Sequence, residues 1–219
     1  MNSMNRSEHL MLLQGSSGQL EAIFTDASTH LQPIIAVICH PHSLMGGTMN
    51  NKVVHTVSRA LREIGIQNVR FNFRGVGQSS GEYDAGIGET DDLLAVLRWV
   101  TQQYPGYKLW LAGFSFGSFV AARTATLAKQ HGFDIEQLLL IAPPVMEPYT
   151  FPSLEKFPCP VSVLMGDADE VVPAEQVYAW FETLPQPARL LKFPDTSHFF
   201  HGKLTDLKNS IHSLYQLPL

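Results

Sequence analysis

A serine flanked by two glycines, Gly113-Phe114-Ser115-Phe116-Gly117, constrains this chain more than any other feature. The apolar run from Lys108 to Ala112 before it predicts a β-strand, and the alanine-rich stretch from Ser118 to Lys129 after it predicts a helix. A serine on so sharp a strand-to-helix turn adopts a strained backbone, so the positions two residues before and after it must lack side chains. An ordinary helix N-cap serine would fit the same five residues, but the flanking strand and helix favour a nucleophile.

Apolar strand-like runs alternate with helical stretches along the chain, which is typical of a mostly parallel sheet covered by helices on both faces. An opening hairpin is expected from Leu10 to Gln14 and Gln19 to Thr25. Further strands are expected at Pro33 to Cys39, Asn68 to Phe73, Lys108 to Ala112, Ile135 to Ala142, Val161 to Met165 and Arg189 to Phe193. Periodic apolar stripes predict helices over residues 53–64, 90–100, 118–129, 173–184 and 204–214. Thr90 is expected to be the N-cap of the second of these helices.

Length and charge limit what the chain can be. With 219 residues, 45% of them hydrophobic, residues 1–219 suit one globular domain. A net charge of −5 without a basic cluster predicts no nucleic-acid partner. The apolar run from Leu10 to Leu13 is too short for a signal peptide or a membrane span, so a cytoplasmic protein without membrane association is expected. The oligomeric state is left open.

The sequence carries no recognisable metal or cofactor motif. Cys39 and Cys159 form neither a metal pattern nor a disulfide framework and are interpreted as small buried thiols. His40 and His42 form an H-x-H pair, but no carboxylate or third histidine lies close to them in sequence. The glycine-rich turn after Phe73 has Ser80 where a dinucleotide motif needs its third glycine. No metal and no cofactor are therefore expected.

A serine nucleophile needs a base to take its proton and a carboxylate to hold that base. In open parallel sheets such groups lie on loops past the carboxyl ends of strands. His198 follows the last expected strand and precedes the final helix, so it is the preferred base, with His201 as the alternative. Five other histidines fall on expected helices or near the start of the chain and are expected at the surface: His9, His30, His55, His131 and His212.

Three carboxylates follow the strand expected from Val161 to Met165. Asp169 is the preferred partner of the base because it stands a few residues past the strand end, with room to turn toward a neighbouring loop. Asp167 is the alternative, interpreted as a residue that bonds local backbone N–H groups in the turn. Glu170 is expected to be exposed.

Acyl transfer also needs two hydrogen-bond donors for the oxyanion. The backbone N–H of Phe116, directly after the serine, is the first candidate. The second is expected from the loop after the strand Pro33 to Cys39, where His42 or Ser43 is favoured because Pro41 has no N–H.

Together these segments resemble the α/β-hydrolase superfamily, in particular its small, cap-less, bacterial esterase-like members. The chain order Ser115, Asp169, His198 is the order that this fold uses. The resemblance extends from about Pro33 to Gly202 and rests on the His-Pro-His segment, the turn from Phe73 to Ser79, Gly113 to Gly117, Gly166 to Pro173 and Ser197-His198. Two positions depart from it: Pro41 stands where many relatives have glycine, and Asn72 where relatives often have aspartate. The departure at Asn72 is expected to affect loop packing and not chemistry.

The resemblance implies a single-domain α/β-hydrolase fold with an eight-stranded, mostly parallel sheet. It implies no cap domain, because relatives with lids insert them between the strands expected at Ile135 and Val161. It also implies acyl transfer to water, in which Ser115 attacks a carbonyl, His198 shuttles the proton and Asp169 orients His198.

The expected substrate is a small acyl compound. A carboxylic ester, a thioester and a lactone use the same machinery, whereas a peptide is the least favoured substrate. Six aromatic residues are expected to line an open cleft suited to an apolar or aromatic acyl group: Phe114, Phe116, Tyr149, Phe151, Phe199 and Phe200. The alternative is a catalytically silent ligand-binding protein with the same fold.

Overall fold

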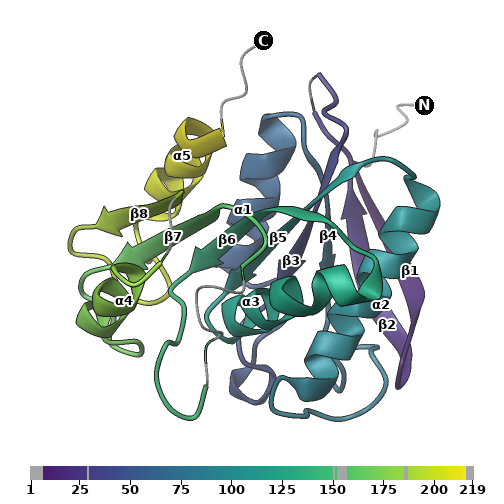
Figure 1. Ribbon diagram of the computed structural model, residues 1–219, viewed down its shortest axis with the longest axis horizontal. Coiled ribbons are helices and arrows are strands. Elements are labelled where there is room, and N and C mark those ends of the chain that lie inside the picture. Colours follow the sequence, from purple (N-terminus) through teal and green to yellow (C-terminus); the bar gives the residue numbers. More distant parts are fainter. Residues whose placement is uncertain (1–6, 29, 150, 152–156, 185–186, 216–219) are drawn as a thin grey trace.

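The computed structural model describes residues 7–28, 30–149, 151, 157–184 and 187–215. These residues form a single α/β domain built on one eight-stranded sheet (Figure 1). The strands, in chain order, are β1 (Glu8–Gly15), β2 (Gly18–Thr25), β3 (Ile34–Cys39), β4 (Gln67–Phe71), β5 (Lys108–Phe114), β6 (Ile135–Ile141), β7 (Val161–Gly166) and β8 (Ala188–Phe193). Each strand expected from the sequence is present.

Helices cover both faces of this sheet. Two of them, α2 (Ile87–Gln103) and α3 (Phe116–Ala128), pack together on one face, and α1 (Lys52–Glu63) and α5 (Leu204–Tyr215) pack together on the other (Figure 1). The shorter α4 (Ala174–Phe181) contacts β7. Two 3₁₀ turns, η1 (Ser43–Met45) and η2 (Lys129–His131), complete the described elements. No helix in the described ranges is both long and apolar enough to cross a membrane.

The strand order in the sheet is β1-β2-β4-β3-β5-β6-β7-β8. The β1–β2 and β2–β4 pairs are antiparallel, and every later pair is parallel. The central strands β3, β4 and β7 are buried along their whole length, as expected for strands covered on both faces. Since residues 142–160 alone join β6 to β7, the predicted cap-less α/β-hydrolase fold is confirmed.

The start of α2 differs from the sequence-based expectation. Thr90 is predicted as its N-cap, but the helix begins at Ile87 and is capped by Gly86 in the left-handed conformation, with φ of 92°. The carboxylate of Glu89 accepts hydrogen bonds from the backbone N–H groups of Asp84 (2.9 Å) and Gly86 (2.8 Å). The prediction was wrong because a glutamate at the third helical position supplies the cap that a threonine side chain would otherwise provide.

Buried polar contacts hold the loops at the carboxyl ends of the strands. Arg74, just after β4, forms a buried ion pair with Asp92 of α2, with 2.9 Å between Nη2 and Oδ1. Asn72 accepts a hydrogen bond from the Met49 backbone N–H (2.8 Å) and donates one to Glu21 (2.7 Å). Asn72 therefore acts in loop packing, as the sequence predicts for this departure from the family pattern.

Close contacts between backbone atoms require glycine at positions 113 and 117, on either side of Ser115. A Cβ atom at Gly117 would collide with the carbonyl oxygens of Cys39 and His40 at the end of β3, and one at Gly113 would collide with the carbonyl of Gly117. These neighbours are main-chain atoms, so they have little freedom to move away. The first turn of α3 therefore lies directly against the end of β3.

We expect Gly117→Ala to lower the free energy of unfolding by about 3 kcal/mol, because the added methyl group displaces packed backbone. The matched control is Gly132→Ala, where φ is 81° but no atom lies within 4 Å of the added Cβ. That variant should lose only about 1 kcal/mol through its left-handed backbone. Urea unfolding of both variants measures the difference, and equal losses would contradict the close-contact interpretation.

Candidate active site

Ser115 occupies a strained turn between β5 and α3. Its φ is 52° and its ψ is −124°, a backbone conformation that residues other than glycine rarely adopt. Its backbone N–H donates to the carbonyl of Ile141 (2.9 Å), and its own carbonyl accepts from the Ser118 hydroxyl (2.6 Å) and backbone N–H (2.8 Å). The strained turn predicted from the glycine pattern is therefore present and is tied to β6 and to α3.

His198 lies in the loop between β8 and α5. Its Nε2 is 3.0 Å from the hydroxyl oxygen of Ser115. The residue is only 2% exposed, and its ring packs against those of Phe114 (centroids 4.9 Å apart) and Phe199 (5.1 Å). The imidazole is thus held against the serine by packing as well as by hydrogen bonding.

Asp169, in the loop after β7, completes a continuous chain of hydrogen bonds. Its Oδ2 is 2.7 Å from Nδ1 of His198, and its Oδ1 accepts from the backbone N–H groups of Val171 (2.9 Å) and Val172 (2.7 Å). A carboxylate beside Nδ1 places the ring proton there, so Nε2 presents its lone pair to Ser115. This is the arrangement that a general base requires.

The structure separates the preferred residues from their alternatives. Asp167 is exposed, and its backbone N–H donates to the Phe193 carbonyl (3.1 Å). His201 is exposed and packs near Phe199, with ring centroids 6.0 Å apart. Neither side chain joins the Ser115–His198–Asp169 chain of hydrogen bonds.

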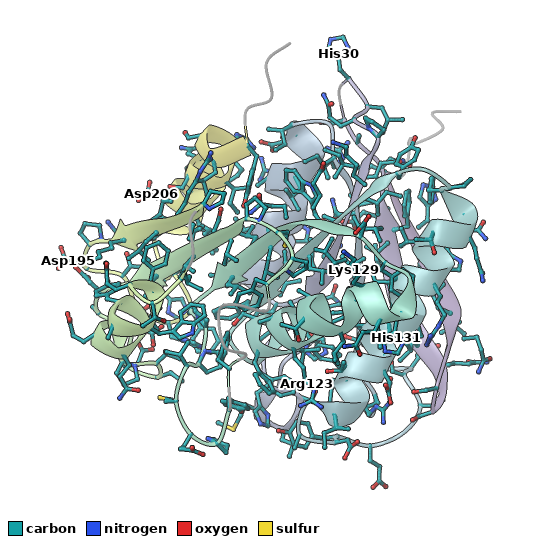
Figure 2. All side chains as sticks on the ribbon, viewed as in Figure 1. His30, Arg123, Lys129, His131, Asp195 and Asp206 are labelled. Atoms are coloured by element: carbon teal, nitrogen blue, oxygen red, sulfur yellow. The ribbon has the colours of Figure 1, made fainter. Side chains whose placement is uncertain are left out.

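Of the five histidines predicted to lie at the surface, four do so. His9, His30, His55 and His131 are exposed; Figure 2 shows His30 at the upper edge of the molecule and His131 beyond the end of α3. His212 is half-buried instead, because it packs against α1, where its Nε2 lies 3.1 Å from the Ala60 carbonyl oxygen.

Glu170 has a contact that the sequence does not reveal. Its side chain is exposed as expected, yet its Oε2 accepts a hydrogen bond from the backbone N–H of His198 (3.1 Å). Two backbone bonds run between the same loops, from Asp167 to Phe193 (3.1 Å) and from Ala168 to Thr196 (3.2 Å). The loops that carry Asp169 and His198 are thereby fastened together at several points.

The loop after β3 packs against the start of α3, next to Ser115. Phe116 is the first residue of α3, so its backbone N–H has no acceptor within the helix. The ring of His42 packs 5.1 Å from that of Phe116, and its Nδ1 accepts from the Leu44 backbone N–H (3.2 Å). Ser43 opens the adjoining 3₁₀ turn. His42 and Ser43 thus lie on the loop beside Phe116, and the choice of second oxyanion donor stays a prediction.

His40 is a buried, neutral link between two loops. Its Nδ1 lies 2.6 Å from the Pro41 carbonyl oxygen, and its Nε2 accepts a hydrogen bond from the Phe73 backbone N–H (3.0 Å). Burial lowers the pKa of its imidazole to about 4. Because backbone groups use both ring nitrogens, His40 is not free to bind a metal in this arrangement. Within the described ranges, no three His, Cys, Asp or Glu residues are grouped as metal ligands.

The predicted aromatic lining is wrong for three of its six residues. Phe114 and Phe116 are each 1% exposed and Phe200 is fully buried. The turn at Ser115 and the loop between β8 and α5 direct these rings toward the core. Phe200 packs on Phe193, with centroids 5.2 Å apart. Tyr149 and Phe151 are half-buried and Phe199 is 39% exposed, so only these three reach the surface.

Cys39 is fully buried and Cys159 is half-buried, and both are free thiols. Burial raises the pKa of each thiol, to about 12 in Cys159, so both are protonated and unreactive at neutral pH. The prediction of a buried thiol is confirmed for Cys39, whereas Cys159 is only partly covered.

Comparison with known proteins places this geometry in a family. The family described as serine aminopeptidase, S33, matches residues 34–157. An uncharacterized protein of Rickettsia prowazekii (strain Madrid E) is 35% identical over 205 residues, which cover 90% of this chain and 84% of that protein.

Two solved structures are similar over nearly the whole chain. One is an alpha-beta serine hydrolase homologue from Coxiella burnetii, with 43% identity, a TM-score of 0.88 and coverage of 98% of this chain and 99% of that one. The other is a Xanthomonas campestris protein described as an α/β serine hydrolase without a lid, with 42% identity, a TM-score of 0.84 and coverage of 97% and 95%.

The buried His40 makes a specific contribution to the pH dependence of stability. Its folded-state pKa of about 4 lies below the ordinary 6.5, so the unfolded chain binds the proton more readily. Its contribution is therefore complete above pH 6.5 and is lost as the pH falls from 6.5 toward 4. Over that window we expect the wild type to lose about 3 kcal/mol more than a His40→Gln variant, which has no ring to protonate.

Urea unfolding at a series of pH values, with wild type and His40→Gln side by side, measures this difference. The variant will be less stable at pH 7, so the comparison concerns the slopes and not the absolute values. Parallel profiles between pH 7 and pH 4 would contradict the role assigned to His40.

Proposed function

Because this chain belongs to the serine aminopeptidase S33 family and is a hydrolase of the α/β serine hydrolase fold, we propose that it hydrolyses carboxylic esters or thioesters of small acyl substrates. Ser115 is the proposed nucleophile, His198 the general base and Asp169 the residue that orients the base. The observation that carries the proposal is the unbroken series Ser115 Oγ to His198 Nε2 (3.0 Å) and His198 Nδ1 to Asp169 Oδ2 (2.7 Å).

In the first half of the reaction, the Ser115 oxygen attacks the substrate carbonyl carbon while its proton moves to Nε2 of His198. The imidazolium that forms is stabilised by the adjacent Asp169 carboxylate, which is kept as an acceptor by two backbone N–H groups. His198 then gives the proton to the leaving alcohol or thiol, and an acyl-enzyme on Ser115 remains.

In the second half, His198 takes a proton from water, and the water oxygen attacks the acyl carbonyl carbon. His198 then returns the proton to the Ser115 oxygen as its bond to the acyl group breaks and the acid leaves. The negative charge on the carbonyl oxygen in both halves needs backbone donors already in position. The N–H of Phe116 at the start of α3 is the proposed first donor, and an N–H from His42 or Ser43 is the proposed second. No cofactor is required for any of these steps.

The architecture around the serine favours small esters, thioesters or lactones over peptides. The chain has no inserted cap between β6 and β7 to enclose a peptide, since residues 142–160 alone form that connection. The family description names an aminopeptidase, so peptide hydrolysis is the activity against which ester hydrolysis has to be compared. 4-Nitrophenyl acetate and alanine 4-nitroanilide, assayed together, make that comparison directly.

A fluorophosphonate probe should label the wild type on Ser115 and should not label Ser115→Ala. Ser115→Ala and His198→Ala should each lower the rate of ester hydrolysis by about three powers of ten or more, while unfolding free energies stay close to wild type. Mass spectrometry of the labelled peptide identifies the modified residue. His201→Gln is the matched control and should label and turn over like the wild type.

A catalytically silent ligand-binding protein would behave differently in the same experiment. It would leave wild type unlabelled, or label wild type and Ser115→Ala equally. Either result would overturn the assignment of Ser115 as nucleophile.

Asp169→Asn should lower kcat/KM for 4-nitrophenyl acetate by about four powers of ten, because an amide no longer holds the proton on Nδ1 of His198. The measurement is a steady-state assay of the wild type and the variant in the same buffer. A loss of less than tenfold would argue against Asp169 as the residue that orients His198.

A further inference from the structure

Three polar aromatic rings gather around Phe116, the residue that follows Ser115 in the chain. The ring centroid of Phe116 lies 5.1 Å from that of His42, 5.7 Å from that of Tyr83 and 5.8 Å from that of Tyr149. The rings of His42 and Tyr83 are themselves 4.8 Å apart. These residues come from three separate connections, after β3, after β4 and after β6, which meet only in the folded protein.

Only the polar rings of this group reach the surface. Phe116 is 1% exposed, and Phe73 beneath it is fully buried, whereas His42, Tyr83 and Tyr149 are half-buried. A substrate that is bound at Ser115 and extends past Phe116 would therefore contact the rings of His42, Tyr83 and Tyr149. We call these three residues the polar aromatic surface.

The position of this surface relative to Ser115 follows from the backbone. Phe116 is the next residue after Ser115, and Gly117 packs against the carbonyls of Cys39 and His40 immediately before the loop that carries His42. His198 has a different neighbour, because its ring packs against Phe199, which is 39% exposed and has no hydrogen-bonding group. Ser115 thus has polar aromatic rings around the next residue in the chain and an exposed apolar ring beside its partner His198.

The polar aromatic surface presents uncharged hydrogen-bonding groups. Nδ1 of His42 accepts from the Leu44 N–H, so the neutral ring carries its hydrogen on Nε2, and burial lowers the pKa of this imidazole. Burial, together with the neighbouring Tyr149, raises the pKa of Tyr83 to about 12, so its phenol stays protonated. The buried carboxylate of Glu89 acts on both His42 and Tyr83 and disfavours a negative charge on a ligand.

From this arrangement, and on the basis of the proposed function, we infer that the substrate is an uncharged ester whose aromatic ring bears a hydroxyl or similar hydrogen-bonding substituent. The ring of the substrate stacks on the polar aromatic surface, and its substituent bonds the hydroxyls of Tyr83 and Tyr149. Stacking on aromatic side chains favours a planar substrate ring over an alkyl group of equal size. A substrate without a polar substituent would cover the tyrosine hydroxyls without giving them a hydrogen bond, which is unfavourable.

Matched pairs of esters test this inference with the polar group on either side of the scissile bond. One pair is methyl phenylacetate and methyl 4-hydroxyphenylacetate; the other is 2-phenylethyl acetate and 2-(4-hydroxyphenyl)ethyl acetate. In at least one pair, the wild-type kcat/KM should be about tenfold higher for the hydroxylated ester, as one or two neutral hydrogen bonds provide. The pair that shows the preference identifies whether the ring belongs to the acyl or the alcohol part.

The variants Tyr83→Phe and Tyr149→Phe remove one hydroxyl each and keep the ring. Each should lower the ratio of the two kcat/KM values by about three- to tenfold. Tyr107→Phe is the matched control, because Tyr107 precedes β5 at its amino end, away from Ser115, and its ratio should equal that of the wild type.

A ratio of one or below in both wild-type pairs would overturn the inference, and so would ratios that are equal in wild type, Tyr83→Phe and Tyr149→Phe. If the wild type is labelled by fluorophosphonate and hydrolyses 4-nitrophenyl acetate but shows such ratios, the inference alone fails. If it is neither labelled nor active on any ester, the proposed function fails and the inference fails with it.

Discussion

The contact between the first turn of α3 and the carboxyl end of β3 is the constraint on which the rest of the site depends. Gly117 lies against the carbonyls of Cys39 and His40, and Gly113 lies against the carbonyl of Gly117, so no side chain fits at either position. This contact forces Ser115 into its strained turn and sets the distance from Ser115 to the loop after β3. The same packed backbone therefore positions both Ser115 and the loop after β3, so neither moves without the other.

His198 and Asp169 depend on a second constraint, the parallel pairing of β7 with β8. This pairing brings the two following loops side by side, and Gly166 lets the Thr196 carbonyl approach the end of β7. Backbone hydrogen bonds and the Glu170 carboxylate then join the loops, which places His198 beside Asp169. Packing of the His198 ring against Phe114 and Phe199 limits its rotation.

Several polar groups buried near the site act as structural links because they have hydrogen-bond or ion-pair partners. His40 forms hydrogen bonds with backbone groups through both ring nitrogens. Arg74, which lies in the same connection as Tyr83, forms a buried ion pair with Asp92. A buried polar group with a full set of partners fixes geometry, whereas one without them would be costly. The polar aromatic surface rests on these links, which explains how three separate loops present neighbouring rings.

The sequence by itself determined the fold class, the eight strands and the candidates Ser115, Asp169 and His198, because apolar periodicity and the glycine pattern are local signals with direct structural meaning. It did not determine the start of α2, the burial of Phe114, Phe116 and Phe200, or the contact of Glu170 with His198. Tertiary structure alone decided which rings surround Phe116, since His42, Tyr83 and Tyr149 are far apart in the chain. The reason is physical: the orientation of a loop side chain depends on atoms from other loops, and these become neighbours only when the sheet has formed.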